Sequence, residues 1–257
     1  MAAGTITGHR HRRRSARLAM PAAVVWVWML AAAGCGDTAG DGDVVVMAAS
    51  SLTDVIETVF EDRKGVTAVI AGSSTLVAQL AAGAEADILI TADATTMERA
   101  TAAGSVRGTP LVIATNALVL AAAPGNPGRV TGLADLARSD LLVGLCSADV
   151  PCGALALQAL DDAEIAPSVD TLELNVRALA TKLSLGELDA GLVYTTDAVM
   201  ADLGVVDASE LEGHANRYYI ASVSAEPPPE VQAVIEDFTG TGSTGAEALH
   251  AHGFGPP

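Results

Sequence analysis

Along most of the chain, short hydrophobic runs alternate with segments in which apolar residues recur every three to four positions. Short apolar runs rich in β-branched residues are typical of buried strands, and the longer spacing is typical of amphipathic helices. The first cycle shows both patterns, because the run Val44–Ala48 is followed by Leu52, Val55 and Val59. The alternation predicts an α/β fold with a mainly parallel sheet that helices cover on both faces.

The same alternation continues to the C-terminal part of the chain. Further strands are predicted at 66–71, 88–90, 118–122, 141–145, 172–174, 190–193 and 218–223, and helices at 76–83, 96–103, 153–160, 176–185, 195–202, 231–238 and 245–250. We interpret these as two α/β lobes, the first formed by 43–115 and 216–257 and the second by 116–215. The connections would pass near Thr115–Asn116 and His214–Arg217. A cleft between such lobes is a natural ligand site.

Residues 1–34 differ from everything that follows them. Basic residues between positions 9 and 17 precede an almost wholly apolar run at 18–33, the order of a secretory signal peptide. That run is short for a stable transmembrane span. We therefore expect an extracytoplasmic protein.

The signal is followed by a possible lipid attachment site. Ala32-Ala33-Gly34-Cys35 resembles a lipobox, in which the cysteine receives a lipid, although a leucine is more usual where Ala32 stands. Residues 35–42 would then be the lipid anchor and a flexible spacer. Two localisations stay open: a lipoprotein anchored to the cell membrane through Cys35, or ordinary secretion to the periplasm or beyond with Cys35 incidental.

Charge excludes several classes of partner. Five of the 14 basic residues and none of the 31 acidic ones lie in residues 1–34, so cleavage leaves nine basic residues and a net charge of −22. Such a charge repels nucleic acid and anionic lipid headgroups. We expect no nucleic-acid partner, and contact with a membrane through a lipid anchor only.

The chain offers little for catalysis or for metal binding. The serine pairs Ser50-Ser51 and Ser73-Ser74 lack the Gly-x-Ser-x-Gly elbow of serine hydrolases, and three histidines follow the signal. We expect no catalytic residues and no enzyme. His250 and His252 are interpreted as a solvated pair near the C-terminal tail rather than as metal ligands.

Cys146 and Cys152 remain in the exported part of the chain. An oxidising compartment permits them to pair, and we predict a disulfide that closes a small loop containing Pro151. Two free buried thiols are the alternative. A metal site is disfavoured, because no further cysteine or nearby histidine completes a ligand set.

Four predicted strand-to-helix junctions are rich in hydrogen-bond donors. Ser51 and Asp54 fit a capping box, Ser73 fits a cap at the second helix, Pro151 fits the first turn of another helix, and Asn175 precedes a fourth. Helix N-termini present free N–H groups and a partial positive charge, so together they can bind a dianion without a cation. For any single junction, ordinary helix capping is the alternative.

Four segments, in this order, resemble the periplasmic molybdate-binding proteins of ABC transporters. They are Met47–Thr53, Gly72–Leu76, Gly83–Ile88 and Gly186–Ala198, and the likeness runs from about Val44 to Phe254. The last segment is the most specific, because a Gly-Glu-Leu-Asp-Ala-Gly run leads into a strand that ends in Val-Tyr-x-x-Asp-Ala. The resemblance implies an α/β fold of the two-lobed type II periplasmic binding proteins, with a ligand cleft between the lobes.

The resemblance also implies a function. The chain would be an extracytoplasmic solute-binding protein that captures molybdate or tungstate and delivers it to the permease of an ABC transporter. It would work as a monomer, without a cofactor, and without a metal beyond the bound oxyanion. Capture of sulfate or another small solute on the same fold is the alternative, and a purely structural surface lipoprotein is a third class.

The resemblance assigns five ligand-binding residues. Ser51 and Ser73 would donate through their hydroxyls, Cys152 and Val176 through backbone amides, and Tyr194 through its hydroxyl. None is basic. Neutral donors favour a fully deprotonated tetrahedral dianion, since the proton of a protonated one would lack an acceptor.

Cys152 stands where the family often has alanine, but a backbone amide survives that change, and a disulfide would hold it in place. Three neighbouring residues, Arg177, Tyr218 and Tyr219, are not assigned to the ligand. Arg177 is expected behind the ligand contacts or at the surface. Tyr218 and Tyr219 are expected in core and interlobe packing.

Overall fold

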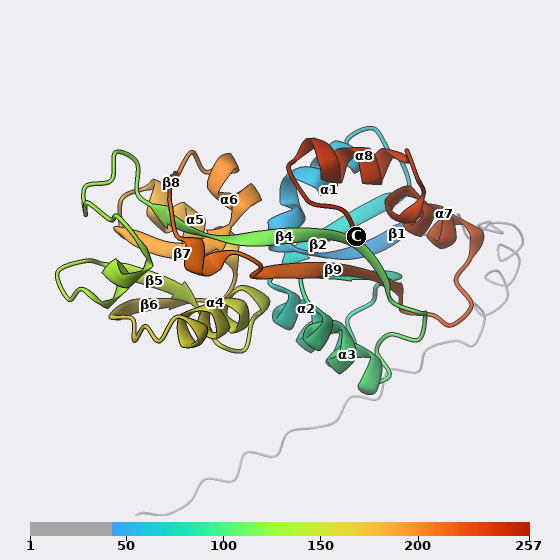
Figure 1. Cartoon of the computed structure of the whole chain (residues 1–257). Helices are drawn as coiled ribbons and strands as arrows, with labels where there is room; N and C mark the ends of the chain where they lie inside the picture. Colours follow the sequence, from blue (N-terminus) through green and yellow to red (C-terminus); the bar gives the residue numbers. More distant parts are fainter. Residues whose placement is uncertain (1–42) are drawn as a thin grey trace, which may run out of the picture. The chain divides into compact units, whose positions relative to one another are not determined.

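The computed structural model describes residues 43–257 (Figure 1). The expected signal peptide at 1–34, the expected lipid site Cys35 and the spacer that ends at residue 42 lie outside the described residues. Within 43–257 no helix combines the length and the apolar character that crossing a membrane requires.

One group of elements, which we call lobe 1, comes from both ends of the described chain. It consists of the strands β1 (Val44–Ala49), β2 (Val66–Ala71) and β3 (Ile88–Thr91) and the helices α1 (Thr53–Phe60), α2 (Ser73–Ala81), α3 (Ala94–Ala102), α7 (Pro229–Thr239) and α8 (Thr244–Ala251). Strand β1 pairs in parallel with β2 on one side and β3 on the other. The carboxyl ends of these strands therefore point the same way, toward the starts of α1 and α2.

A second group, which we call lobe 2, comes from the middle of the chain. It consists of the strands β5 (Val143–Cys146), β6 (Val169–Glu173), β7 (Ala190–Tyr194) and β8 (Gly204–Val206) and the helices α4 (Pro151–Asp162), α5 (Val176–Ser184) and α6 (Thr195–Met200). Strand β5 pairs in parallel with β6 and β7. Helices α4, α5 and α6 each begin close to the carboxyl end of one of these strands.

Two longer strands run between the groups. Strands β4 (Leu111–Ala122) and β9 (Ala215–Ser222) are antiparallel partners that lie side by side in Figure 1. Strand β9 also pairs with β3, and β4 with β7, so the sheet order is β2-β1-β3-β9-β4-β7-β5-β6. At the predicted crossing points, Thr115 pairs with Arg217 and Asn116 with Asn216.

The expectation of a mainly parallel sheet is wrong for β4, β8 and β9. These strands pair antiparallel with their neighbours. The reason is topological, because β4 carries the chain out of lobe 1 and β9 brings it back along the same line. The α/β class itself is as predicted, and the parallel pairs lie inside the two groups.

Hydrophobic packing is separate on the two sides of the β4–β9 crossing. The largest cluster of buried side chains draws all its members from residues 118–211. Two other clusters draw theirs from 44–114 and 218–254. The described residues 43–257 nevertheless belong to one compact unit, so the predicted lobe boundaries stay a prediction.

Candidate ligand-binding site

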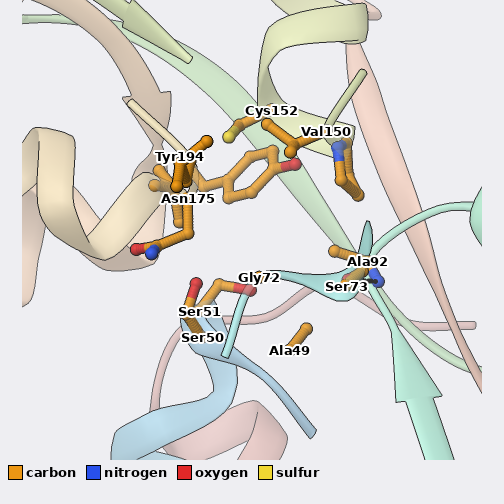
Figure 2. Close-up of a pocket in the computed structure, with 13 residues that line it drawn as sticks. Ala49, Ser50, Ser51, Gly72, Ser73, Ala92, Val150, Cys152, Asn175 and Tyr194 are labelled. Carbon is orange, nitrogen blue, oxygen red and sulfur yellow. Dashed lines mark hydrogen bonds between the residues drawn. The ribbon is translucent and has the colours of Figure 1, made fainter. Parts of the chain in front are cut away.

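A small cavity lies where the starts of α1, α2, α4 and α5 approach one another (Figure 2). Its volume is about 10 Å³, taken as the space open to the centre of a water molecule. The lining residues are Ala49, Ser50, Ser51, Gly72, Ser73, Ala92, Val150, Pro151, Cys152, Leu174, Asn175, Val176 and Tyr194. The structure thus brings together all five residues that the sequence assigned to a ligand, and none of the five is more than 3% exposed.

Lobe 1 supplies one wall of the cavity. Strand β1 ends at Ala49 and passes through the 3-10 turn Ser50–Leu52 into α1, and β2 passes through Gly72 into α2. A Cβ atom at Gly72 would stand 2.6 Å from the carbonyl oxygen of Leu174 in lobe 2. Glycine therefore permits the two walls to approach closely here.

Lobe 2 supplies the facing wall. Figure 2 shows Val150, Cys152, Asn175 and Tyr194 across from the serines of lobe 1. The side chain of Asn175 caps α5, accepting a 2.9 Å hydrogen bond from the amide of Ala178.

The start of α4 is held by covalent and steric constraints. The expected disulfide is present between Cys146, at the end of β5, and Cys152, in the first turn of α4. Pro151 occupies the first position of the helix, where its missing N–H costs nothing. A Cβ atom at Gly153 would overlap the carbonyl oxygen of Ser147, at 1.9 Å. The disulfide and this close approach together fix the amide of Cys152 beside the cavity.

The cavity is rich in donors and has no formal positive charge. The first amides of an α-helix have no acceptor within the helix, and those of Ser73 in α2, Cys152 in α4 and Val176 in α5 belong to this class. The helix dipoles add partial positive charge at the same three ends. No lysine or arginine lines the cavity. Such an arrangement can hold an anion through neutral groups alone.

The three hydroxyls of the site have buried partners. The Oγ atom of Ser51 lies 2.7 Å from the Oη atom of Tyr218. The Oγ atom of Ser73 accepts from the amide of Ala92 at 3.0 Å, and the Oη atom of Tyr194 accepts from Nδ2 of Asn216 at 2.6 Å. The pKa of Tyr194 is raised well above its ordinary value, mainly by burial and next by the nearby Tyr218, so this phenol stays protonated and able to donate.

The capping roles predicted for the serines are wrong. Ser51 lies within the 3-10 turn, Leu52 takes the cap position of α1, and no side chain caps that helix. Asp54, the expected second member of the capping box, instead contacts Arg177. At α2 the cap position belongs to Gly72, and Ser73 is the first helical residue. Both serine hydroxyls are therefore free of capping.

Arg177 lies outside the cavity lining and joins the two lobes. Its Nη2 atom is 2.5 Å from Oδ2 of Asp54, and its Nε atom is 3.5 Å from Oδ1 of Asp197. Asp197 is fully buried, and burial raises its pKa to about 7 even though Arg177 opposes that shift. This places Arg177 behind the residues that line the cavity, as expected.

The two remaining tyrosines take part in hydrophobic packing. Tyr218 is fully buried and meets Tyr194 and Phe254 in edge-to-face contacts, with ring centroids 6.3 and 5.2 Å apart. Tyr219 is half-buried and packs against the lobe 1 cluster that includes Met47 and Leu76.

Sequence reasoning missed the residues that hold the hydroxyls. Asn216 and the amide of Ala92 have no motif of their own, because their roles arise from pairing between strands far apart in the chain. Asn216 lies within the connection between lobes that was predicted near His214–Arg217, and that prediction was the available signal that it lies near the site. Within 43–257 no group of three or more histidine, cysteine, aspartate or glutamate residues has the arrangement of a metal site.

Comparison with known proteins gives a consistent result. A family model described as bacterial extracellular solute-binding protein matches residues 44–255. The chain is 35% identical over 237 residues to the molybdate-binding protein ModA of Mycobacterium tuberculosis, covering 88% of this chain and 90% of that protein.

Two solved structures share the fold. The periplasmic molybdate-binding protein of Azotobacter vinelandii matches with a TM-score of 0.66 and 18% identity, covering 84% of this chain and all of that one. The sulfate-binding protein SubI of Mycobacterium tuberculosis matches with a TM-score of 0.63 and 17% identity, covering 84% and 87%.

Proposed function

The chain belongs to the bacterial extracellular solute-binding proteins, and from that premise we propose that it captures molybdate or tungstate for import by an ABC transporter. The ModA relative is named for molybdate binding and is similar along nearly its whole length. The proposed task is solute capture and delivery rather than catalysis, with no cofactor.

The donor-rich, uncharged lining of the cavity carries this proposal. Ser51, Ser73 and Tyr194 would donate through hydroxyls, and Cys152 and Val176 through amides, to the oxygens of one tetrahedral ion. A dianion without protons can accept from every one of these groups. A protonated oxyanion would place a donor against donors, which costs about 1–3 kcal/mol when the group stays unpaired.

The size of the cavity narrows the ligand class further. A space of about 10 Å³ for the centre of a water molecule is close to that of a single water, so it has no room for an extended organic solute. Sulfate is the second candidate, because it is also a tetrahedral dianion and because the fold is shared with a sulfate-binding protein. Molybdate and sulfate differ in size rather than in hydrogen-bonding character.

The setting of the protein completes the proposal. We place it outside the cytoplasm, with residues 1–34 as the export signal and Cys35 as the site of a lipid anchor. Its partners would be the oxyanion and the permease of an ABC transporter, and it would act as a monomer.

A calorimetric titration tests the function directly. The chain would be expressed with its own N-terminal segment, purified from the extracytoplasmic fraction and titrated with molybdate, tungstate, sulfate and phosphate. We expect tight one-to-one binding of molybdate and tungstate and little response to phosphate. A strong sulfate response with none to molybdate would support the second candidate instead.

A pair of serine variants then tests the site. Ser51→Ala should weaken molybdate binding by one to two decades, because one donor to a charged oxygen contributes about 1.5–3 kcal/mol. Ser209→Ala, at an exposed position of lobe 2 outside the cavity, is the matched control and should bind as the parent does. Absence of binding to all four anions would remove the oxyanion function and leave the shared fold.

A further inference from the structure

A hydroxyl group can donate a hydrogen bond or accept one, and its neighbours decide which role is left for a ligand. A site made of serine and tyrosine hydroxyls is therefore not a donor-only site by composition. The proton of a hydroxyl is left for a ligand where its oxygen already accepts from a group that can only donate. The hydroxyls of Tyr194 and Ser73 both meet this condition.

Asn216 fixes the direction of the Tyr194 hydroxyl. The Nδ2 atom of Asn216 lies 2.6 Å from Oη of Tyr194 and 3.3 Å from the carbonyl oxygen of Pro151. A carbonyl oxygen only accepts, so the amino side of the Asn216 side chain must face it, and the same nitrogen donates its second hydrogen to Tyr194. The phenolic proton of Tyr194 is left for the cavity.

The backbone fixes Ser73 in the same way. Its Oγ atom accepts from the amide of Ala92 at 3.0 Å, and a backbone amide cannot reverse its role. Ser51 differs, because its partner is the hydroxyl of Tyr218 and either oxygen can donate. The direction of two of the three hydroxyls is thus set by the fold before a ligand arrives.

We propose that Asn216 is a positioning residue for specificity, which acts through Tyr194 to exclude oxyanions that carry a proton. This inference rests on the proposed function and deepens it. With Asn216 present, the oxygen of Tyr194 already holds an incoming hydrogen bond, and an oxyanion proton that points at it finds no free acceptor. Without Asn216 the phenol is free to turn and accept that proton.

Asn216 also has a simpler possible role as a tie between β9 and the first turn of α4. In that case its loss would loosen the cavity for every ligand, and the loss would not depend on the tyrosine hydroxyl. A double-mutant cycle separates the two roles, because it measures whether one residue acts through the other.

The cycle uses the parent, Asn216→Leu, Tyr194→Phe and the double variant, each titrated with molybdate. We expect Asn216→Leu to raise Kd by roughly three- to tenfold in the parent. In the Tyr194→Phe background the same change should raise Kd by less than about twofold, since the hydroxyl that it orients is gone. An equal factor in both backgrounds would overturn the proposal and leave the structural tie.

The matched control is Asn116→Leu. Asn116 is the cross-strand partner of Asn216 and is also buried. Its Nδ2 atom donates to Thr196 at 2.8 Å and to the hydroxyl of Tyr218 at 3.5 Å, and it makes no hydrogen bond to Tyr194. Its loss should lower the melting temperature, and any effect on Kd should be the same with Tyr194 or Phe at position 194. If Asn216→Leu fails to fold, Asn216→Ala introduces no new bulk and serves in its place.

Anion selectivity is the second readout. Sulfate carries no proton at pH 7.5, whereas phosphate is present there mainly as hydrogen phosphate, and the two ions are similar in size. Asn216→Leu should reduce the preference for sulfate over phosphate, measured by thermal shift, by at least about threefold. An unchanged preference would overturn the proposal. A parent that binds no oxyanion at all would overturn the proposed function as well, so the two failures are distinguishable.

Discussion

Asp197 lies fully buried in the first turn of α6, and neither of its carboxylate oxygens has a hydrogen-bond partner. The charged groups that face it are Arg177, which favours its ionised form, and Asp54, which disfavours it. Burial outweighs the arginine and raises the pKa of Asp197 to about 7. In the folded protein this side chain therefore binds a proton at pH values at which the unfolded chain has released it.

The sign of the resulting pH dependence follows from linkage. The stabilising effect of the proton on Asp197 is fully present below the unfolded pKa of 3.8 and is lost as the pH rises to about 7. Asp197→Asn should remove this loss, so the variant gains stability relative to the parent between pH 4 and pH 7, by up to about 4 kcal/mol. Urea unfolding of both proteins across that range measures the difference. A difference that does not vary with pH would contradict the burial of this charge.

At the scale of single residues, the sequence identified which residues line the cavity better than it identified their hydrogen-bond partners. Serines and a tyrosine at strand ends were identified correctly as cavity residues because the motifs place them there. Their partners Asn216, Tyr218 and Ala92 are 19 to 167 positions away in the chain. The pairs made by Asn216 and Tyr218 depend on the register between β9 and its neighbours, which no local pattern specifies.

Comparison of the predicted and observed strands shows which local patterns were sufficient to locate an element. The β2 range was predicted to the residue, because a β-branched apolar run is flanked by polar and glycine residues. Strand β4 begins at Leu111, whereas the sequence predicted a start at residue 118. The first half of β4 pairs with β9, and buried and exposed side chains alternate less regularly there. Strand β8 was missed, because three residues are too short for a periodic pattern.

Cap chemistry was the signal that misled. Serine is a preferred cap, and Ser51 and Ser73 both stand beside a helix start. In each case the cap position lies one residue away from the serine, at Leu52 for α1 and at Gly72 for α2. The serine hydroxyls form their hydrogen bonds with other groups. A ligand site competes with a cap for the same residue type, so the local pattern alone does not distinguish them.

The start of α4 can be tested chemically, because a disulfide holds it. The Cys146–Cys152 disulfide closes a loop of five intervening residues, and a loop of this length is worth about 2 kcal/mol in the chain-entropy model. Cys146→Ser should lower the melting temperature and also weaken molybdate binding, because the amide of Cys152 loses its tether. Cys146 itself does not line the cavity, so a binding effect reports on α4.

Reducing agent provides the control for that variant. Dithiothreitol should reproduce both effects in the parent and add nothing to Cys146→Ser, which locates the reducible bond. If affinity and melting temperature both stay at parental values, the disulfide does not position the helix start.

Over the whole molecule, contacts between the lobes surround the cavity without being part of it. The ion pair of Arg177 with Asp54 joins α5 to α1. On another element of lobe 1, Ser74 donates to the carbonyl oxygen of Asp149 at 2.6 Å and accepts from Arg99 at 2.8 Å. The strands β4 and β9 connect the two cores across this region. This arrangement favours a hinge at the crossing strands, with these contacts made when the lobes close around a ligand.

Asp54→Asn tests whether closure contributes to affinity. The change keeps the shape of the side chain and leaves the cavity lining intact, but it removes the charge that meets Arg177 from the other lobe. A partly exposed pair contributes up to about 1 kcal/mol, so molybdate should dissociate roughly two- to fivefold faster, with its association rate nearly unchanged. Stopped-flow measurement of both rates tests this prediction.

Asp140→Asn is the matched control, because it breaks the Arg138–Asp140 pair inside lobe 2 and should leave dissociation at the parental rate. Equal dissociation rates in the two variants would mean that the pair forms without regard to the ligand, and the hinge interpretation would then lose its support.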